Sequence, residues 1–197
     1  MNAEQWEAHW KRAWKSENVV DFNDPKWAVY NEIIRVVTER IKTHGNQVLL
    51  DFGCGAGSLL FRLRNIRGVT CIGFDISETA VGLCRARDLN VLHEDIADLA
   101  MDGTAGIVVA TSVVDCATVL AGDVLRLMTS CCAPGGLVVL AVPEGETGDY
   151  SQRSTFDVES LSVLAANNGL EICSCRRIVS EGQPFVVLTA ENANATD

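Results

Sequence analysis

The sequence predicts an α/β fold in which helices cover both faces of a mostly parallel, doubly wound sheet. Short apolar runs suited to buried strands alternate along most of the chain with segments of helical periodicity. A turn with glycines at alternate positions, Gly53, Gly55 and Gly57, follows the first apolar run. Acidic side chains lie at the ends of the first and second runs, at Asp51 and Asp75. These features are typical of a domain that binds a ligand beyond the carboxyl ends of its strands.

The composition is that of one globular domain with an acidic surface. The 197 residues are 48% hydrophobic and 21% charged, and the formal net charge is −10 at pH 7. We expect neither nucleic acid nor a membrane surface as a partner, because both attract basic proteins. No apolar run approaches the length of a membrane span, and no apolar core follows Met1 as in a signal peptide. A small-molecule partner and a monomeric or homodimeric state are expected.

Eight cysteines are many for this length, but most of them fall inside predicted strands and helices. No pair has C-x-x-C spacing with partner ligands, so no metal site is expected. We interpret the cysteines as reduced structural thiols of a cytoplasmic protein.

An amphipathic helix is predicted over residues 3–16. Trp6, Trp10 and Trp14 recur every four residues and therefore share one face. This face either packs the helix on the domain or forms a lid over the substrate, and both roles can hold because aromatic lids exclude water. His9 in the same helix is interpreted as a surface residue or as a base that lines the site.

A second helical stripe covers about residues 26–43 and ends at Gly45, which suits a C-terminal cap. Tyr30 on this stripe packs in the core or points its hydroxyl toward the site. Residues 1–45 are therefore predicted as a helical cap segment that precedes the sheet.

Alternating strands and helices follow from residue 46. Ser77 is a plausible N-cap for the helix after the second strand. The turn Ala133-Pro134-Gly135-Gly136 cannot continue a helix, so it separates the preceding helix from the fifth strand. Strands are expected at residues 47–52, 69–74, 90–92, 106–111 and 137–142, and helices at 57–66, after Ser77 and at 122–132.

The C-terminal part is predicted to hold one more helix and a hairpin. Ser154 and Asp157 are interpreted as the capping box of that helix. Two apolar runs then follow without a helix between them, so we expect them to pair around a turn at residues 181–184. The expected segments are a helix over 155–167, strands over about 170–178 and 184–190, and a frayed polar tail over 192–197.

The acidic residues around the glycine turn predict which chemical groups the ligand carries. The spacing G-x-G-x-G differs from the G-x-G-x-x-G of dinucleotide sites, and Asp51 would repel a pyrophosphate but suits an ammonium group. Asp75 can accept hydrogen bonds from both hydroxyls of a ribose. Glu94 and Asp95 follow the third strand, where an acid can accept from the amine of adenine. The inferred ligand carries an amine, a ribose and an adenine, and no phosphate.

At this point the chain resembles the class I S-adenosylmethionine (SAM)-dependent methyltransferases. LLDFGCGAG, GFDIS and HEDIADL resemble their first three motifs, AGIVVATSVVDCA the fourth, and APGGLVVLAVPE the turn into strand five. The resemblance covers about residues 45–190 and is closest to small MetW/UbiG-like members. It implies a Rossmann-like domain over residues 46–191 with helices on both faces of a seven-stranded sheet. The implied strand order is 3-2-1-4-5-7-6, with strand seven antiparallel.

The resemblance also implies SAM as cofactor, with S-adenosylhomocysteine (SAH) as its product. In this family the glycine turn and the acid before it hold the methionine part, and the acid after strand two takes the ribose hydroxyls. The next two motifs hold the adenine and line the sulfonium. The implied cofactor-binding residues are Asp51, Gly53, Cys54, Gly55, Gly57, Asp75, Ile76, Asp95, Ile96, Thr111 and Ser112.

The implied reaction is an in-line displacement that moves the sulfonium methyl to an O, N, S or C atom of a small molecule. A base is needed only where that atom carries a proton at neutral pH. The fourth motif of the family often carries Glu-His, but Asp115-Cys116 stand here. The catalytic residue is therefore left open among Asp115, Tyr150 and His9.

Two other functions compete with methyl transfer. A non-catalytic module that binds SAM and regulates a partner is compatible with the motifs, and the missing histidine slightly favours it. An NAD(P)-dependent oxidoreductase is disfavoured by the glycine spacing, by Asp51 and by the lack of a Tyr-x-x-x-Lys sequence.

Overall fold

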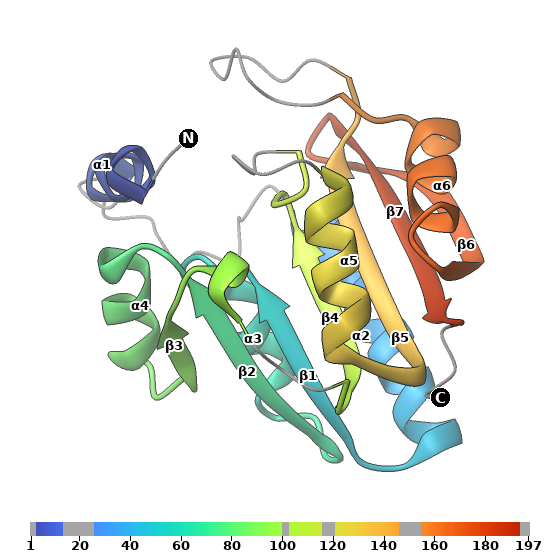
Figure 1. Cartoon of the computed structure of the whole chain (residues 1–197). Helices are drawn as coiled ribbons and strands as arrows, with labels where there is room; N and C mark the ends of the chain where they lie inside the picture. Colours follow the sequence, from blue (N-terminus) through green and yellow to red (C-terminus); the bar gives the residue numbers. More distant parts are fainter. Residues whose placement is uncertain (1–2, 14–25, 100–102, 116–120, 146–154, 194–197) are drawn as a thin grey trace.

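The protein forms one seven-stranded sheet with helices on both faces (Figure 1). A computed structural model describes residues 3–13, 26–99, 103–115, 121–145 and 155–193. The strand order is β3-β2-β1-β4-β5-β7-β6, as the resemblance implies. The strands are β1 (Gln47–Phe52), β2 (Val69–Asp75), β3 (Val91–His93), β4 (Ala105–Thr111), β5 (Cys132–Pro143), β6 (Leu170–Ser180) and β7 (Gln183–Asn192).

The first five strands pair in parallel, whereas β7 runs antiparallel between β5 and β6. Parallel pairing brings the carboxyl ends of β1, β2, β3 and β4 to one edge of the sheet. In Figure 1 the arrowheads of β1 and β2 point toward this edge. The acids and glycines that the sequence singles out therefore gather there. The predicted fold class is confirmed.

Six α-helices and one 3₁₀ helix are present in the described residues. Figure 1 shows α5 in front of the sheet and α2 behind it. The 3₁₀ helix η1 (Ile96–Asp98) follows β3 directly. The α-helices are α1 (Ala3–Ala13), α2 (Trp27–His44), α3 (Ser58–Leu63), α4 (Glu78–Arg85), α5 (Ala121–Cys131) and α6 (Val158–Ala166).

The sheet is buried on both faces, as a doubly wound fold requires. Ile107 and Val109 of β4 join the cluster of hydrophobic side chains beneath α2, α3 and α4. Their neighbours Val108 and Ala110 join the cluster beneath α5 and α6. Successive side chains of a strand point to opposite faces, so one continuous apolar run supplies both clusters.

One predicted helix cap is confirmed by the structure, and another is wrong. Ser77 caps α4 by accepting from the Ala80 N–H at 3.2 Å, which confirms its predicted role. Asp157 is the N-cap of α6 and forms a capping box with Ser160, so the predicted pairing of Ser154 with Asp157 is wrong. The motif begins at Asp157 because Ser160 stands three residues further on, where both reciprocal hydrogen bonds can form. Ser154 lies outside the described residues.

The β6–β7 hairpin has a two-residue turn instead of the predicted four. Glu181 and Gly182 both have positive φ, at 50° and 81°, which matches the right-handed twist of the paired strands. Pro184 therefore belongs to β7, where it lies opposite Val179. β6 and β7 are therefore both longer than the strands that the apolar residues predict.

β5 also begins earlier than predicted. It starts at Cys132, immediately after α5, and the Pro-Gly-Gly residues lie inside its bounds. A shift in pairing between Ala105 and Ile107 of β4 takes up the irregularity. The predicted helix over 3–16 is described to Ala13, so Trp14 lies outside the described residues. The division into a cap segment over 1–45, a domain over 46–191 and a tail stays a prediction.

Candidate functional site

The glycine turn connects β1 to α3 at the carboxyl edge of the sheet. Gly53, Gly55 and Gly57 all have left-handed backbone, with φ of 64°, 54° and 77°. A Cβ on Gly53 would lie 2.5 Å from Val113 Cγ2, and one on Gly57 would lie 2.5 Å from Leu89 Cδ1. Glycine is therefore favoured at all three positions by the left-handed backbone, and at Gly53 and Gly57 also by the close packing of Val113 and Leu89.

Asp75 is a buried carboxylate at the end of β2. Its exposure is 6%, and both of its oxygens accept hydrogen bonds from the backbone. Oδ2 accepts from the Gly55 N–H at 2.8 Å, and Oδ1 accepts from the Ser77 N–H at 2.9 Å. Each oxygen has a second lone pair, so the carboxylate can still accept from two hydroxyls. Burial raises the pKa of this carboxyl, while the two N–H donors oppose the rise.

Asp51 lies one strand away, near the end of β1, and is 3% exposed. Burial raises the pKa of Asp51 to about 8, and the charge of Asp75 adds to the rise, whereas Lys26 opposes it. The Asp51 carboxyl therefore favours its neutral form at pH 7. The sequence predicts an acid for an ammonium group, but it does not predict that this acid keeps its proton.

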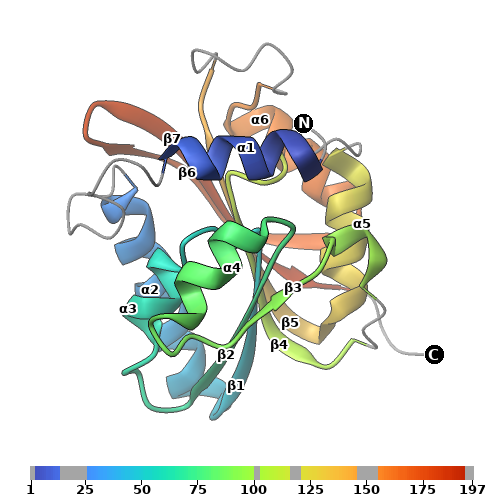
Figure 2. The same ribbon diagram turned by 90° about the vertical axis from the view of Figure 1, so that its left-hand side faces the viewer.

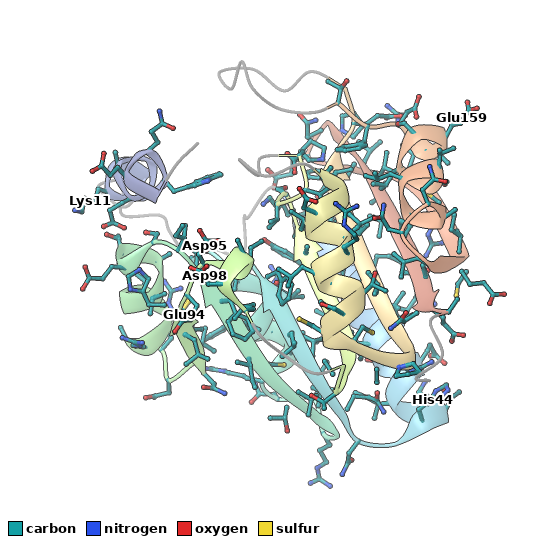
Figure 3. All side chains as sticks on the ribbon, in the orientation of Figure 1. Lys11, His44, Glu94, Asp95, Asp98 and Glu159 are labelled. Atoms are coloured by element: carbon teal, nitrogen blue, oxygen red, sulfur yellow. The ribbon has the colours of Figure 1, made fainter. Side chains whose placement is uncertain are left out.

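Asp95 follows β3 at the same edge. His93 of β3 lies opposite Asp75, and Asp95 caps η1 by accepting from the Ala97 N–H at 2.9 Å. In Figure 3, Asp95 lies with Glu94 below α1, at the end of the molecule opposite His44. His93 Nε2 is 2.9 Å from the Ile76 carbonyl oxygen and joins β3 to the residue after Asp75. The sequence analysis missed this histidine, because nothing local marks a contact across two strands.

Thr111 and Ser112 end β4 in a strained turn. Ser112 has a φ of 57°, which is unfavourable for a residue other than glycine, and its N–H donates to the Ala141 carbonyl at 2.7 Å. Among the described residues, no group accepts from or donates to the buried hydroxyls of Thr111 and Ser112. Strain and unpaired buried hydroxyls concentrate at ligand sites, which is consistent with the predicted role of this turn.

Two thiols lie at the glycine turn, Cys54 within it and Cys84 on α4. The Cys84 Sγ donates to the Gly55 carbonyl at 3.2 Å, from the buried face of α4. A hydrogen bond with Cys84 and burial raise the pKa of Cys54, so this thiol stays protonated. Cys54 is therefore not expected to act as a nucleophile, and Cys84 supports the turn through its hydrogen bond to Gly55. The sequence analysis did not single out Cys84.

The structure describes some of the other candidate residues and leaves others undescribed. Asp115 is buried, at 3% exposure, in the segment after β4. Tyr30 is 7% exposed and packs in the α2–α3–α4 cluster, with the Arg62 guanidinium 5.7 Å from its ring centre. Trp6 on α1 is half-buried. Tyr150, Cys116, and the side chains of His9 and Trp10 lie outside what the structure describes.

The described part of the chain contains no group of three or more His, Cys, Asp or Glu side chains placed to hold a metal ion. The seven cysteines within it are free thiols. No helix among the described residues is long and apolar enough to cross a lipid bilayer.

We expect the buried Asp51 carboxyl to make stability depend on pH. Its folded pKa of about 8 lies above the usual value near 4, so between these pH values only the folded protein keeps the proton. The free energy of unfolding then falls as pH rises through this window, by at most about 1.4 kcal/mol per pH unit. Asp51→Asn should lose less stability than the wild type between pH 5 and pH 7.5 in urea denaturation.

The exposed Glu94→Gln is the matched control for this experiment and should follow the wild type. Equal pH slopes for the wild type and Asp51→Asn would contradict the neutral carboxyl. The pKa of Asp75 is also raised, so Asp75 also lowers the free energy of unfolding as pH rises. Both proteins retain Asp75, so the difference between their pH slopes reports Asp51 alone.

Comparisons with known proteins agree with this fold. A family model described as "Methionine biosynthesis protein MetW" matches residues 31–116. A search of curated protein sequences found no match.

Three solved structures are similar over most of the chain. The magnesium protoporphyrin IX methyltransferase ChlM from Synechocystis PCC 6803 with bound SAM is 15% identical, with a TM-score of 0.75, and 98% of each chain is covered. The N-methyltransferase NodS from Bradyrhizobium japonicum WM9 with SAH is 14% identical, with a TM-score of 0.77, covering 95% of this chain and 98% of NodS. The cyclase SpnF is 15% identical, with a TM-score of 0.69, covering 83% of this chain and 81% of SpnF.

At such low sequence identities the similar structures establish only the fold. The chemistry has to be inferred from the residues of the site. The strand order, the antiparallel β7 and the MetW match agree with what the motifs imply. The resemblance predicted from the sequence is confirmed, and the chain has the fold of the class I SAM-dependent methyltransferases.

Proposed function

We propose that this protein is a SAM-dependent methyltransferase that acts on a small molecule. The observation that carries the proposal is the buried Asp75 carboxylate, held by the Gly55 and Ser77 N–H groups beside the glycine turn. A buried carboxylate costs free energy unless hydrogen bonds compensate for its lost hydration. This one keeps acceptor capacity for two more donors, which suits a ribose better than it suits a structural role alone.

The residues of the site fit SAM. Asp75 would take the ribose hydroxyls, the turn from Gly53 to Gly57 would hold the methionine part, and Asp51 would take the ammonium. Ile76, Asp95 and Ile96 would hold the adenine. The hydroxyls of Thr111 and Ser112, which have no partner among the described residues, would line the sulfonium end of the site. When bound, SAM supplies a methyl group that its sulfonium already activates.

The protein then has to orient the acceptor and keep water away. Alignment of reacting groups and removal of water supply much of the rate in such transfers. The glycine turn, which packs closely on Val113 at Gly53 and on Leu89 at Gly57, would form one wall of the site. Asp115, Tyr150 and His9 remain the candidates for a base, with Asp115 the buried one among the described residues.

A small-molecule acceptor is favoured by the charge of the chain. The net charge of −10 opposes binding of nucleic acid. ChlM, which shares the fold, is named for a small-molecule acceptor, magnesium protoporphyrin IX. The methylated atom is an O, N, S or C atom of the acceptor. We propose a monomer or homodimer in the cytoplasm, on the basis of the composition.

A non-catalytic SAM-binding module is the second candidate. It is favoured by Asp115-Cys116, which stand where the family often has Glu-His. SpnF also has this fold and is named a cyclase, so the fold does not by itself imply methyl transfer. A module of this kind would bind SAM and transfer no methyl group to any acceptor.

SAM with a labelled methyl group tests the proposed function directly. The protein is incubated with labelled SAM and a cell extract, and the products are separated into small-molecule, protein and nucleic-acid fractions. We expect label in the small-molecule fraction, and none when Asp75→Ala replaces the wild type. Label in a macromolecular fraction would overturn the substrate class. Binding of SAM without label in any fraction would favour the non-catalytic module.

Asp75→Ala should weaken SAM binding strongly. Loss of two hydrogen bonds to a charged acceptor costs about 2–4 kcal/mol, or roughly 30- to 1,000-fold in affinity. Isothermal titration calorimetry measures the change, and circular dichroism checks that the variant is folded. Exposed Asp98→Ala at the same edge is the control. An unchanged affinity for Asp75→Ala would place the cofactor elsewhere.

SAM binding at pH 7 should release a proton from Asp51. The carboxyl is neutral without ligand, and an ammonium group beside it would favour the charged form. Calorimetry in phosphate and in Tris, whose ionisation enthalpies differ, counts the protons released. We expect up to about one for the wild type and fewer for Asp51→Asn. Equal apparent enthalpies in the two buffers for the wild type would contradict this linkage.

A further inference from the structure

Glu7 attaches α1 to the beginning of α4. Its Oε2 accepts from the Ser77 hydroxyl at 2.6 Å and from the Thr79 N–H at 3.3 Å. Its Oε1 accepts from the Thr79 hydroxyl and lies 3.3 Å from Lys11 Nζ. One carboxylate thus collects three donors from a single turn of α4. These hydrogen bonds, led by that of Ser77, lower the pKa of Glu7 to about 2, so Glu7 is ionised at neutral pH.

The first turn of α4 favours an anion at this position. Ser77 is the N-cap, and the Thr79 N–H is one of the first N–H groups of a helix, which have no partner within the helix. The positive end of the helix dipole also attracts a carboxylate. The Glu7 carboxylate supplies the anion that this turn of α4 favours. Within the described residues, the exposed Glu4 on the same helix accepts no such hydrogen bonds.

The Glu7 hydrogen bonds hold α1 against α4. The two hydrophobic clusters of the protein include no α1 side chain among the described residues. α1 lies across the carboxyl ends of the strands, beyond α4 (Figure 2). The Glu7 contact thus fixes α1 at this position, next to the candidate site.

The same turn of α4 also holds the candidate ribose-binding carboxylate. The Ser77 hydroxyl donates to Glu7, while the Ser77 N–H donates to Asp75 Oδ1 at 2.9 Å. Asp75 Oδ2 in turn accepts from Gly55 in the glycine turn. Three successive hydrogen bonds therefore join α1 to the turn that would hold the methionine part of SAM.

We propose that Glu7 is a positioning residue that holds α1 over the ribose end of the cofactor site, so that SAM or SAH leaves after this contact breaks. The inference rests on the proposed function. It makes cofactor binding and the docking of α1 reciprocal, because each stabilises the other by the same factor.

The first test needs no cofactor. Hydrogen–deuterium exchange of the free protein should show faster exchange of the α1 amides in Glu7→Ala than in the wild type, by about tenfold. Glu4→Ala is the matched control on the same helix and should exchange as the wild type does. Alanine favours a helix, so faster exchange in Glu7→Ala reports loss of docking rather than loss of helix propensity. Equal exchange in the two variants would overturn the proposal.

The second test measures the dissociation of SAM. Three of the four tryptophans lie between Trp6 and Trp14, so intrinsic fluorescence in stopped flow can follow the release of SAM into excess SAH. Glu7→Ala should raise the dissociation rate about tenfold, and Glu7→Gln by less because its amide oxygen can still accept. Thr79→Val should also raise the rate. The double variant Glu7→Ala/Thr79→Val should add little to Glu7→Ala, because both changes remove the same contact.

The outcomes separate this inference from the proposed function. A wild type that binds no SAM would overturn the proposed function, and this inference with it. A wild type that binds SAM, with an unchanged dissociation rate in Glu7→Ala, would overturn the role of Glu7 alone. Fully additive effects of Glu7→Ala and Thr79→Val would also overturn it, because the two residues would then act independently.

Discussion

The arrangement of the carboxyl edge depends on one buried carboxylate. Asp75 ends β2 and takes backbone hydrogen bonds from Gly55 on one side and Ser77 on the other. Burial of a charge is tolerated only where hydrogen bonds replace its hydration, so both donors must stay in position. This requirement fixes the glycine turn relative to the start of α4. Through the Ser77 hydroxyl and Glu7 it also fixes α1, which lies 70 residues earlier in the sequence.

A second buried acid gives the site its electrostatic character. Asp51 and Asp75 lie at the ends of adjacent strands, and burial combined with their mutual repulsion favours a proton on Asp51. A cationic ligand would relieve this repulsion, whereas an anionic one would add to it. The edge of the sheet is therefore suited to a ligand that brings a positive charge and hydroxyl donors. That selectivity comes from the acids, because the glycine turn alone would also suit a phosphate.

The sequence predicted the elements well where a local pattern carries the information. The apolar runs and the Gly53–Gly57 turn gave the strand order through the family resemblance, and the acids fell at the carboxyl ends of β1 and β2 as expected. The errors lie at element ends. The α6 cap moved to Asp157 and Ser160, and the hairpin turn shortened to Glu181 and Gly182. End positions depend on hydrogen bonds that compete within a few residues, and an apolar pattern does not rank them.

The sequence by itself determined the fold class and the position of the glycine turn, because strand periodicity and parallel pairing bring these residues to one edge. The type of ligand is a prediction from the acidic residues at that edge. The roles of the site residues in binding stay predictions. Only the tertiary structure decided which groups hold the site together: Glu7 on Ser77, Cys84 beneath Gly55, and His93 on Ile76. It also decided that Asp51 keeps its proton. These features depend on burial and on contacts between distant parts of the chain, neither of which a local pattern contains.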